Sequence, residues 1–237
     1  MTIENGRLAA EPFTLDTHGF CLARVPSAVA DFTDADAVAR DYAPEVGRIV
    51  RELTGAGLVV PMGAQVRSSG ATGKTVQPPA AEAHVDFTGR SARMLAERLY
   101  PAGRPGWTRF LAFSLWRTFS PAPQDWPLAL ADFRTVKEED GVPNVKVDVD
   151  AIPEGDALFA DIPGEDQMMA ATIFRHDPAH RWYYFPDMDR DELILIKFHD
   201  SDHARAWRAP HTAFRDPTRP DAVTRESIEF RGMAFWE

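Results

Sequence analysis

The order of hydrophobic and polar residues predicts many short β-strands and few helices. Apolar residues recur at helical spacing between about residues 34 and 53, with Asp34 or Thr33 as N-cap and glycine after the end. A shorter helix is predicted over 91–99. Short apolar or alternating runs predict strands at 13–16, 20–25, 58–66, 107–119, 125–135, 170–175, 181–185, 193–198 and 225–231.

These elements predict a mainly β fold with flanking helices. Strands follow one another without a regular β–α–β alternation, which favours an antiparallel sandwich or barrel. We expect a single domain over 1–237, with N-terminal strands and a helix in 1–75 and the core in 76–237. Residues 67–80 are rich in Ser, Gly and Pro and are predicted to form a loop that closes over a site. Residues 137–167 are acidic and rich in turns.

Composition narrows the class of protein. The net charge of −10 argues against nucleic acid as a partner, because contact with phosphates requires a basic face. The sequence contains no apolar run of about 18 residues, so we expect no membrane span. Cys21 is the only cysteine, which excludes an internal disulfide and fits a reducing cytoplasm. The oligomeric state is not indicated, and a homodimer stays open.

Candidate chemistry begins at Ala83-His84-Val85-Asp86-Phe87-Thr88. On a strand, His84 and Asp86 point to the same face, as two ligands of one metal must. His-x-Asp arises often by chance, so a third ligand is needed, and His211 in Pro210-His211-Thr212 is the best candidate. Non-haem Fe(II) oxygenases bind their metal with two histidines and one carboxylate on one face and leave the other positions of the metal open.

A second pair follows His211 along the chain. Arg225 and Ser227 share one face of the last predicted strand. A guanidinium and a hydroxyl together can bind the distal carboxylate of a dicarboxylic acid. If a 2-oxo acid chelates the metal, this pair would hold its other end. The alternative is an arginine in a salt bridge, with Glu229 as its partner.

The ordered set His84-x-Asp86, His211 and Arg225-x-Ser227 resembles the iron(II)/2-oxoglutarate-dependent oxygenases. Longer matches resemble the CmcJ/NvfI-type hydroxylases and desaturases, and they cover about residues 80–232. The matching segments are 83–88, Leu115-Trp116-Arg117, 126–132, 180–188, Lys197-Phe198-His199-Asp200-Ser201, 210–214 and 225–229. Thr118-Phe119 departs from the family pattern, in which a proline is expected.

The resemblance implies a double-stranded β-helix, that is, a jelly-roll or cupin-like core. It implies Fe(II), 2-oxoglutarate and O₂ as cofactor and co-substrates. The expected function is hydroxylation, desaturation or cyclisation of a small molecule of secondary metabolism, such as an antibiotic. His84, Asp86 and His211 would bind the metal, and Arg225 with Ser227 would bind 2-oxoglutarate.

Six further residues are candidates for contact with substrate or for support of the site. Arg117 ends an apolar strand next to Trp116, so we expect this cation to anchor substrate in a polar cavity, or else to form an ion pair near Asp132 or Asp86. Lys197 is interpreted as touching a carboxylate inside the barrel or as a strand residue that reaches solvent. The remaining candidates are Thr88, Tyr184 and Arg231.

Other interpretations stay open. The site could belong to a non-catalytic cupin-like binding protein, or to an iron oxygenase that does not use 2-oxoglutarate. His176 and His180 have helical zinc-ligand spacing, but Pro178 between them favours a turn. His199 and His203 are read as part of the loop after a strand, and they are the next candidates if His211 is not a ligand.

Overall fold

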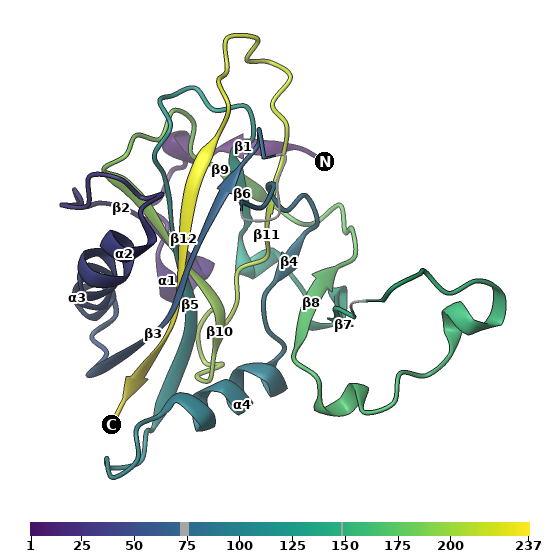
Figure 1. The fold of residues 1–237 in the computed structure, drawn as a ribbon. Coiled ribbons are helices and arrows are strands. Elements are labelled where there is room, and N and C mark those ends of the chain that lie inside the picture. The colour runs from purple at the N-terminus through teal and green to yellow at the C-terminus, as the bar shows by residue number, and fades with distance from the viewer. Residues whose placement is uncertain (72–75, 148) are drawn as a thin grey trace.

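The computed structural model describes residues 1–71, 76–147 and 149–237, in which two β-sheets pack face to face. Part of the 67–80 loop, residues 72–75, therefore lies outside the described residues. Figure 1 shows the smaller sheet with the helix α3 on its outer side, and the larger sheet opposite it. The termini lie at different ends of this sandwich.

The larger sheet contains seven strands in the order β1-β9-β6-β11-β4-β8-β7, and the first pair is parallel. Every other pairing in it is antiparallel. The strands are β1 (Ile3–Asn5), β4 (His84–Val85), β6 (Leu128–Ala131), β7 (Gly141–Val145), β8 (Ala170–Phe174), β9 (Trp182–Tyr184) and β11 (His211–Ala213).

The smaller sheet contains five antiparallel strands in the order β2-β10-β5-β12-β3. All of its strands except β2 are longer than those of the larger sheet, and they form a continuous wall against which the shorter strands pack. They are β2 (Phe20–Arg24), β3 (Leu58–Ser68), β5 (Arg109–Thr118), β10 (Glu192–Asp200) and β12 (Glu226–Trp236).

One helical segment covers the outer face of the smaller sheet. It contains α2 (Ala35–Ala37), a π-helical turn (Val38–Tyr42) and α3 (Ala43–Thr54). Asp34 caps its start, because its side chain accepts hydrogen bonds from the backbone of residues 36 and 37. Gly55 ends it with a φ of 73°, a conformation that glycine adopts without strain. The other helices are α1 (Leu15–His18) and α4 (Gly89–Leu99).

The core is divided into two layers by the smaller sheet. Alternate residues of β10 show this division: Ile194 and Ile196 pack between the sheets, whereas Leu193 and Leu195 pack under α3. Both faces of the central strands are therefore buried. A polar side chain on these strands reaches the space between the sheets only if it points to the inner face.

The prediction of a mainly β jelly-roll with flanking helices is confirmed. The predicted strand at 13–16 is wrong, since residues from Leu15 onward form α1, capped by Thr14. The acidic region 137–167 holds β7 and 3₁₀ turns, and its later part extends away from the sheets in Figure 1. Among the residues that the structure describes, no helix is both long and apolar enough to span a bilayer.

Candidate metal and co-substrate site

Two neighbouring strands of the larger sheet bring His84, Asp86 and His211 together. His84 begins β4, Asp86 follows its end, and His211 on β11 is the direct register partner of His84. One ligand atom from each residue lies within 4.8 Å of the others. This is the only such group of three His, Cys, Asp or Glu residues found in the described part of the chain.

Backbone carbonyls orient both imidazole rings. Nδ1 of His84 donates to the carbonyl of Glu82 (2.6 Å), and Nδ1 of His211 donates to that of Ala209 (3.1 Å). This assignment leaves each Nε2 without a proton and available as a ligand. The ring of Phe198 stacks on that of His211 at 5.4 Å and 14°, which limits its rotation.

The charges of the three residues suit a bound cation. Burial raises the pKa of Asp86, but the hydrogen bond to His84 and the charge of Arg231 outweigh this and lower it to about 2. Burial and the neighbouring His84 lower the pKa of His211 to about 3. Burial opposes protonation of His84 as well, but its contact with Asp86 raises its pKa overall. At neutral pH the group therefore holds a carboxylate and at least one neutral imidazole.

A cavity between the sheets connects these ligands with Arg225. Its lining includes His84, His211, Trp116, Ser114 and Arg225. The Arg225 side chain is fully buried, donates to the carbonyl of residue 126 (2.9 Å), and lies over the Trp116 ring at 5.6 Å.

Three buried polar atoms near this cavity have no hydrogen-bond partner among the described residues. They are Nε of Arg225, Oγ of Ser227 and Oγ of Ser114. Burial lowers the pKa of Arg225 to about 10, so its guanidinium is still charged at neutral pH. A buried cation beside two unpaired hydroxyls forms a site for an anion with several oxygen acceptors, such as a carboxylate.

Arg231 also lies at the site, where it contacts the metal-binding group. Its guanidinium contacts Asp86 at 2.9 Å and Glu229 at 2.6 Å. Glu229 in turn accepts a hydrogen bond from Arg67 on β3 at 3.1 Å. The sequence reasoning missed Ser114, Arg67 and Glu229 as members of the site. The alternation Arg225, Ser227, Glu229, Arg231 along β12 was the signal that could have found Glu229.

Arg117 is placed differently from the expectation of a substrate anchor. Its side chain points to the opposite face of β5, toward α3, and is fully buried. It donates to the hydroxyl of Tyr42 (3.3 Å) and to two backbone carbonyls, and Glu45 lies 3.8 Å away. The alternative of an ion pair with Asp132 or near Asp86 is also wrong. Its neighbour Trp116 points inward and lines the cavity.

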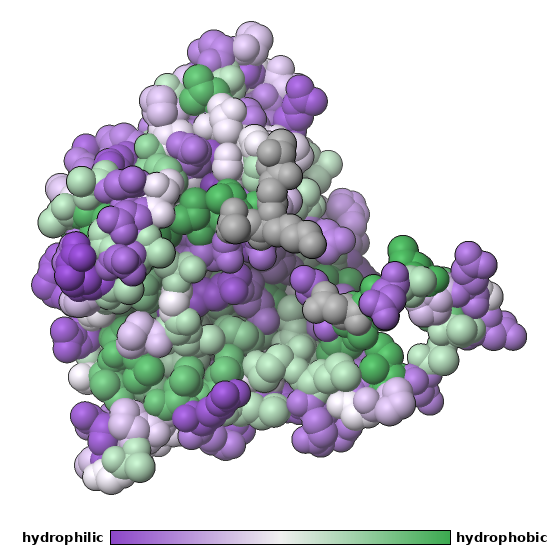
Figure 2. All heavy atoms as spheres, viewed as in Figure 1, coloured by the Kyte–Doolittle hydropathy of each residue, from purple (hydrophilic) through white to green (hydrophobic). Residues whose placement is uncertain are grey.

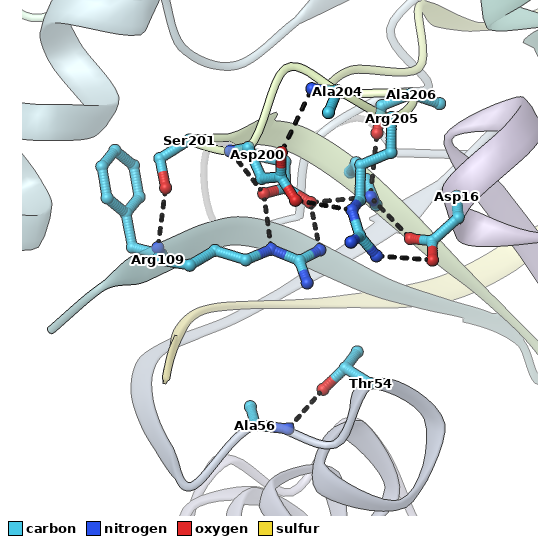
Figure 3. A network of polar contacts seen from close by, with 12 residues as sticks. Asp16, Thr54, Ala56, Arg109, Asp200, Ser201, Ala204, Arg205 and Ala206 are labelled. Atoms are coloured by element: carbon cyan, nitrogen blue, oxygen red, sulfur yellow. Dashed lines mark hydrogen bonds and ion pairs between the residues drawn. The ribbon is translucent and has the colours of Figure 1, made fainter. Parts of the chain in front are cut away.

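Lys197 also lies outside the space between the sheets. It bonds to Asp200 (2.7 Å) and to the carbonyl of residue 206 (2.8 Å) on the outer face of β10. Figure 3 shows Arg109 bound to the same Asp200 carboxylate, at 2.9 and 2.5 Å. Lys197 is therefore part of a polar network distinct from the metal ligands.

Tyr184 and Thr88 contact other parts of the fold and do not face the cavity. Tyr184 is the register partner of Ala129, on the outer face of the larger sheet, and its ring packs edge-on against Phe214 at 5.2 Å. Thr88 caps α4 by accepting the backbone N–H of Ser91 at 3.1 Å. Neither residue lines the cavity that contains His84 and Arg225.

The rival histidines do not form a second group. His180, which precedes β9, contacts Asp140, which precedes β7, at 2.8 Å, and Asp177 and Pro178 belong to a turn. His203 stacks on Trp207 at 4.5 Å, with His199 packed edge-on beside it. His199 belongs to β10, which extends further than predicted.

Fold and site together define a class of protein: a jelly-roll with a two-histidine, one-carboxylate metal site of the facial type.

A family model described as an oxidoreductase/YMDC permease-like domain matches residues 1–235. The hydroxylase/desaturase efuI of Hormonema carpetanum is 32% identical, over 95% of this chain and 79% of that relative. The Fe(II)/2-oxoglutarate-dependent dioxygenase nvfI of Aspergillus novofumigatus is 31% identical, over 98% and 81%.

A solved structure supports the same assignment. The iron and alpha-ketoglutarate-dependent endoperoxidase NvfI superposes with a TM-score of 0.80 at 28% identity, over 94% of this chain and 81% of that one. The chain belongs to the hydroxylase/desaturase family of Fe(II)/2-oxoglutarate-dependent dioxygenases that includes efuI and nvfI.

Proposed function

We propose that this protein is an Fe(II)/2-oxoglutarate-dependent oxygenase that oxidises a small molecule of secondary metabolism. Its relatives include a hydroxylase/desaturase, and a dioxygenase and an endoperoxidase whose names state a dependence on iron and 2-oxoglutarate. His84, Asp86 and His211 would hold Fe(II), since two imidazoles and one carboxylate match the preference of this ion. Family membership favours this function over a non-catalytic cupin-like protein.

The observation that carries the proposal is the unpaired anion site in the cavity of the metal ligands. Nε of Arg225 and Oγ of Ser227 are buried without partners, and Arg225 lines the same cavity as His84 and His211. A 2-oxo dicarboxylic acid fits this arrangement: its 2-oxo acid end would face the metal and its distal carboxylate Arg225. In an iron oxygenase without such a co-substrate, Nε of Arg225 and Oγ of Ser227 would stay buried without hydrogen-bond partners.

Bound Fe(II) supplies O₂ activation, and the overall reaction converts 2-oxoglutarate, O₂ and a substrate C–H into succinate, CO₂ and an oxidised product. The chain would contribute by fixing three metal ligands and by pairing a dicarboxylate with the buried Arg225 in the cavity between the sheets. Hydroxylation, desaturation and cyclisation use the same ligand set, so the product depends on how the substrate is oriented.

An apolar surface next to the site would receive the primary substrate. Figure 2 shows a hydrophilic hollow with an apolar area below it, over the lower part of β3 and beside α4. Partly buried apolar residues that pack against the core between the sheets include Val60 and Met62 on β3 and Phe87 after Asp86. Such a surface suits a largely hydrocarbon skeleton, and the net charge of −10 does not suit nucleic acid.

A cytoplasmic location is part of this proposal. A single cysteine and an Fe(II) requirement fit the reducing cytoplasm. Light scattering of the purified protein would decide between a monomer and a homodimer.

The decisive experiment is succinate formation from 2-oxoglutarate with Fe(II) and O₂, across a panel of apolar candidate metabolites. Wild type should form succinate slowly alone and faster with a true substrate, whereas Asp86→Ala should form none. Succinate production that does not depend on added Fe(II), or that persists in Asp86→Ala, would reject the proposal.

A further inference from the structure

The two oxygens of the Asp86 carboxylate have different partners. Oδ1 lies on the side of the metal ligands, 3.5 Å from Nε2 of His84. Oδ2 is 2.9 Å from the guanidinium of Arg231. A carboxylate can bind a cation through one oxygen or through both. Here the contact with Arg231 leaves one oxygen available.

Arg231 is itself fixed and does not swing freely. Glu229, two residues earlier on β12, accepts from it at 2.6 Å, and Arg67 holds Glu229 from β3 at 3.1 Å. Arg67 also donates to the carbonyl of Pro78 at 3.0 Å. Asp86, Arg231, Glu229 and Arg67 thus form a row of alternating charges with no net charge. Because Glu229 offsets its charge, Arg231 can stand near a metal cation without a large repulsion.

Two-histidine, one-carboxylate sites function because positions remain open on the metal. A 2-oxo acid that chelates needs two of these positions, and O₂ needs another. If Asp86 bound through both oxygens, it would take a position that the co-substrate requires. A side-chain contact that prevents Asp86 from binding through both oxygens would therefore keep a metal position free for the co-substrate.

We propose that Arg231 is a positioning residue that holds Oδ2 of Asp86 away from the metal, so that the carboxylate binds through Oδ1 alone. Glu229 and Arg67 keep Arg231 in this place. The inference rests on the proposed function, and it assigns to Arg231, Glu229 and Arg67 a role in orienting a metal ligand.

The test uses Arg231→Met, Arg231→Lys and the matched control Arg7→Met. Arg7 is equally exposed (34% against 33%) and pairs with the carboxylate of Glu192, far from the metal ligands. Each protein is loaded with Mn²⁺, which supports no turnover, and titrated with 2-oxoglutarate by calorimetry. Each is also loaded with Co²⁺ alone, and its visible spectrum is recorded as a report on the ligand geometry.

Arg231→Met should weaken 2-oxoglutarate binding about tenfold to a hundredfold, the usual effect of removing a residue that supports a metal ligand. It should also change the Co²⁺ spectrum before any 2-oxoglutarate is added. Arg231→Lys, which retains a positive charge to pair with Oδ2, should restore most of both properties. Arg7→Met should match Arg231→Met in thermal stability while both metal readouts stay at wild-type values.

Three results would overturn the inference. One is an unchanged 2-oxoglutarate affinity in Arg231→Met. Another is a weakened affinity with an unchanged Co²⁺ spectrum, which would make Arg231 a direct contact of the co-substrate. If Arg231→Met does not fold, Glu229→Ala decides, because loss of the oxygen that accepts from Arg231 should release its guanidinium and shift the Co²⁺ spectrum in the same direction, and no shift rejects the idea. Wild type that binds Co²⁺ but not 2-oxoglutarate would reject the proposed function, while the Co²⁺ spectra would still test the effect of Arg231 on Asp86.

Discussion

His84 and His211 are direct register partners on β4 and β11, with ring centroids 4.5 Å apart. They are far apart in sequence, so the pairing of two short strands is what creates the site. A register slip of one residue would turn His211 to the opposite face of the sheet. The metal site therefore depends on the register between these strands as much as on the ligands.

Replacing His211 by Ala should abolish turnover and greatly weaken metal binding, because only one imidazole and one carboxylate would remain. The fold should persist, since the main-chain pairing of β11 with β4 and β6 does not need the imidazole. Metal content and succinate formation test this, with far-ultraviolet circular dichroism as the check on folding. The control is His176→Ala at an exposed position. Near-normal activity in His211→Ala would show that the third ligand is elsewhere.

Arg225→Ala should raise the 2-oxoglutarate concentration needed for half-maximal rate. A charge-assisted hydrogen bond contributes about 1.5–3 kcal/mol, which corresponds to roughly tenfold to a hundredfold. Ser227→Ala should have a smaller effect, because a neutral hydroxyl contributes about 0.5–1.5 kcal/mol. The exposed Arg215→Ala serves as the control. A 2-oxoglutarate dependence identical to wild type in Arg225→Ala would remove this residue from the co-substrate site.

The sequence could predict the polar face of β12 but not those of β5 and β10. On β12, Ser227, Glu229 and Arg231 alternate with the apolar residues Ile228 and Phe230, and Arg225 just before the strand continues the same spacing, so the period of two is visible. On β5 and β10 both faces are buried, one against the larger sheet and one under α3 or α1. Apolar residues then occupy both sets of positions, and the pattern no longer distinguishes inside from outside.

This loss of alternation explains the misplacement of Arg117 and Lys197. Each is a cation within a largely apolar stretch of strand, so the metal-binding interior is the polar environment that the sequence alone favours for it. The structure provides polar partners on the other face: carbonyls and Tyr42 for Arg117, and Asp200 for Lys197. The partners of Arg117 come from distant segments, so no local pattern indicates them. Asp200 is only three residues from Lys197, but a regular strand would place the two on opposite faces, and a register shift between Lys197 and His199 interrupts β10 there.

Arg117→Met should destabilise the protein and should not act selectively on catalysis. Its guanidinium is fully buried with three hydrogen bonds, and removal would leave Tyr42 and two carbonyls without a donor. Loss of one partner of a buried polar cluster costs about 3–5 kcal/mol. Denaturant unfolding measures this, with the exposed Arg48→Met as control. Substrate-coupled and uncoupled 2-oxoglutarate turnover should fall together, and a selective loss of coupled turnover would return Arg117 to the substrate site.

Asp200→Asn should lower stability at neutral pH, and the deficit should shrink in acid. Burial raises the pKa of Asp200, but hydrogen bonds and charges from Arg109 and Lys197 outweigh this and lower it. Because the pKa of Asp200 in the folded state lies below the unfolded value of about 3.9, the ionised carboxylate stabilises the fold above that pH. This stabilisation is lost as the pH falls through the folded-state pKa. The expected deficit at pH 7 is about 3–5 kcal/mol, because Lys197 would remain buried without its counter-ion.

Urea unfolding at several pH values between neutral and about pH 3 tests this, with Asp191→Asn as the matched control. Asp191 is exposed, and its carboxylate lies 3.4 Å from Arg24 at the surface. For the control, the difference from wild type should be small and nearly independent of pH. For Asp200→Asn, the free energy of unfolding should approach that of wild type only as the wild-type carboxylate takes up a proton. A deficit that stays constant across this range would show that Asp200 acts through packing and hydrogen-bond geometry, with its charge contributing little.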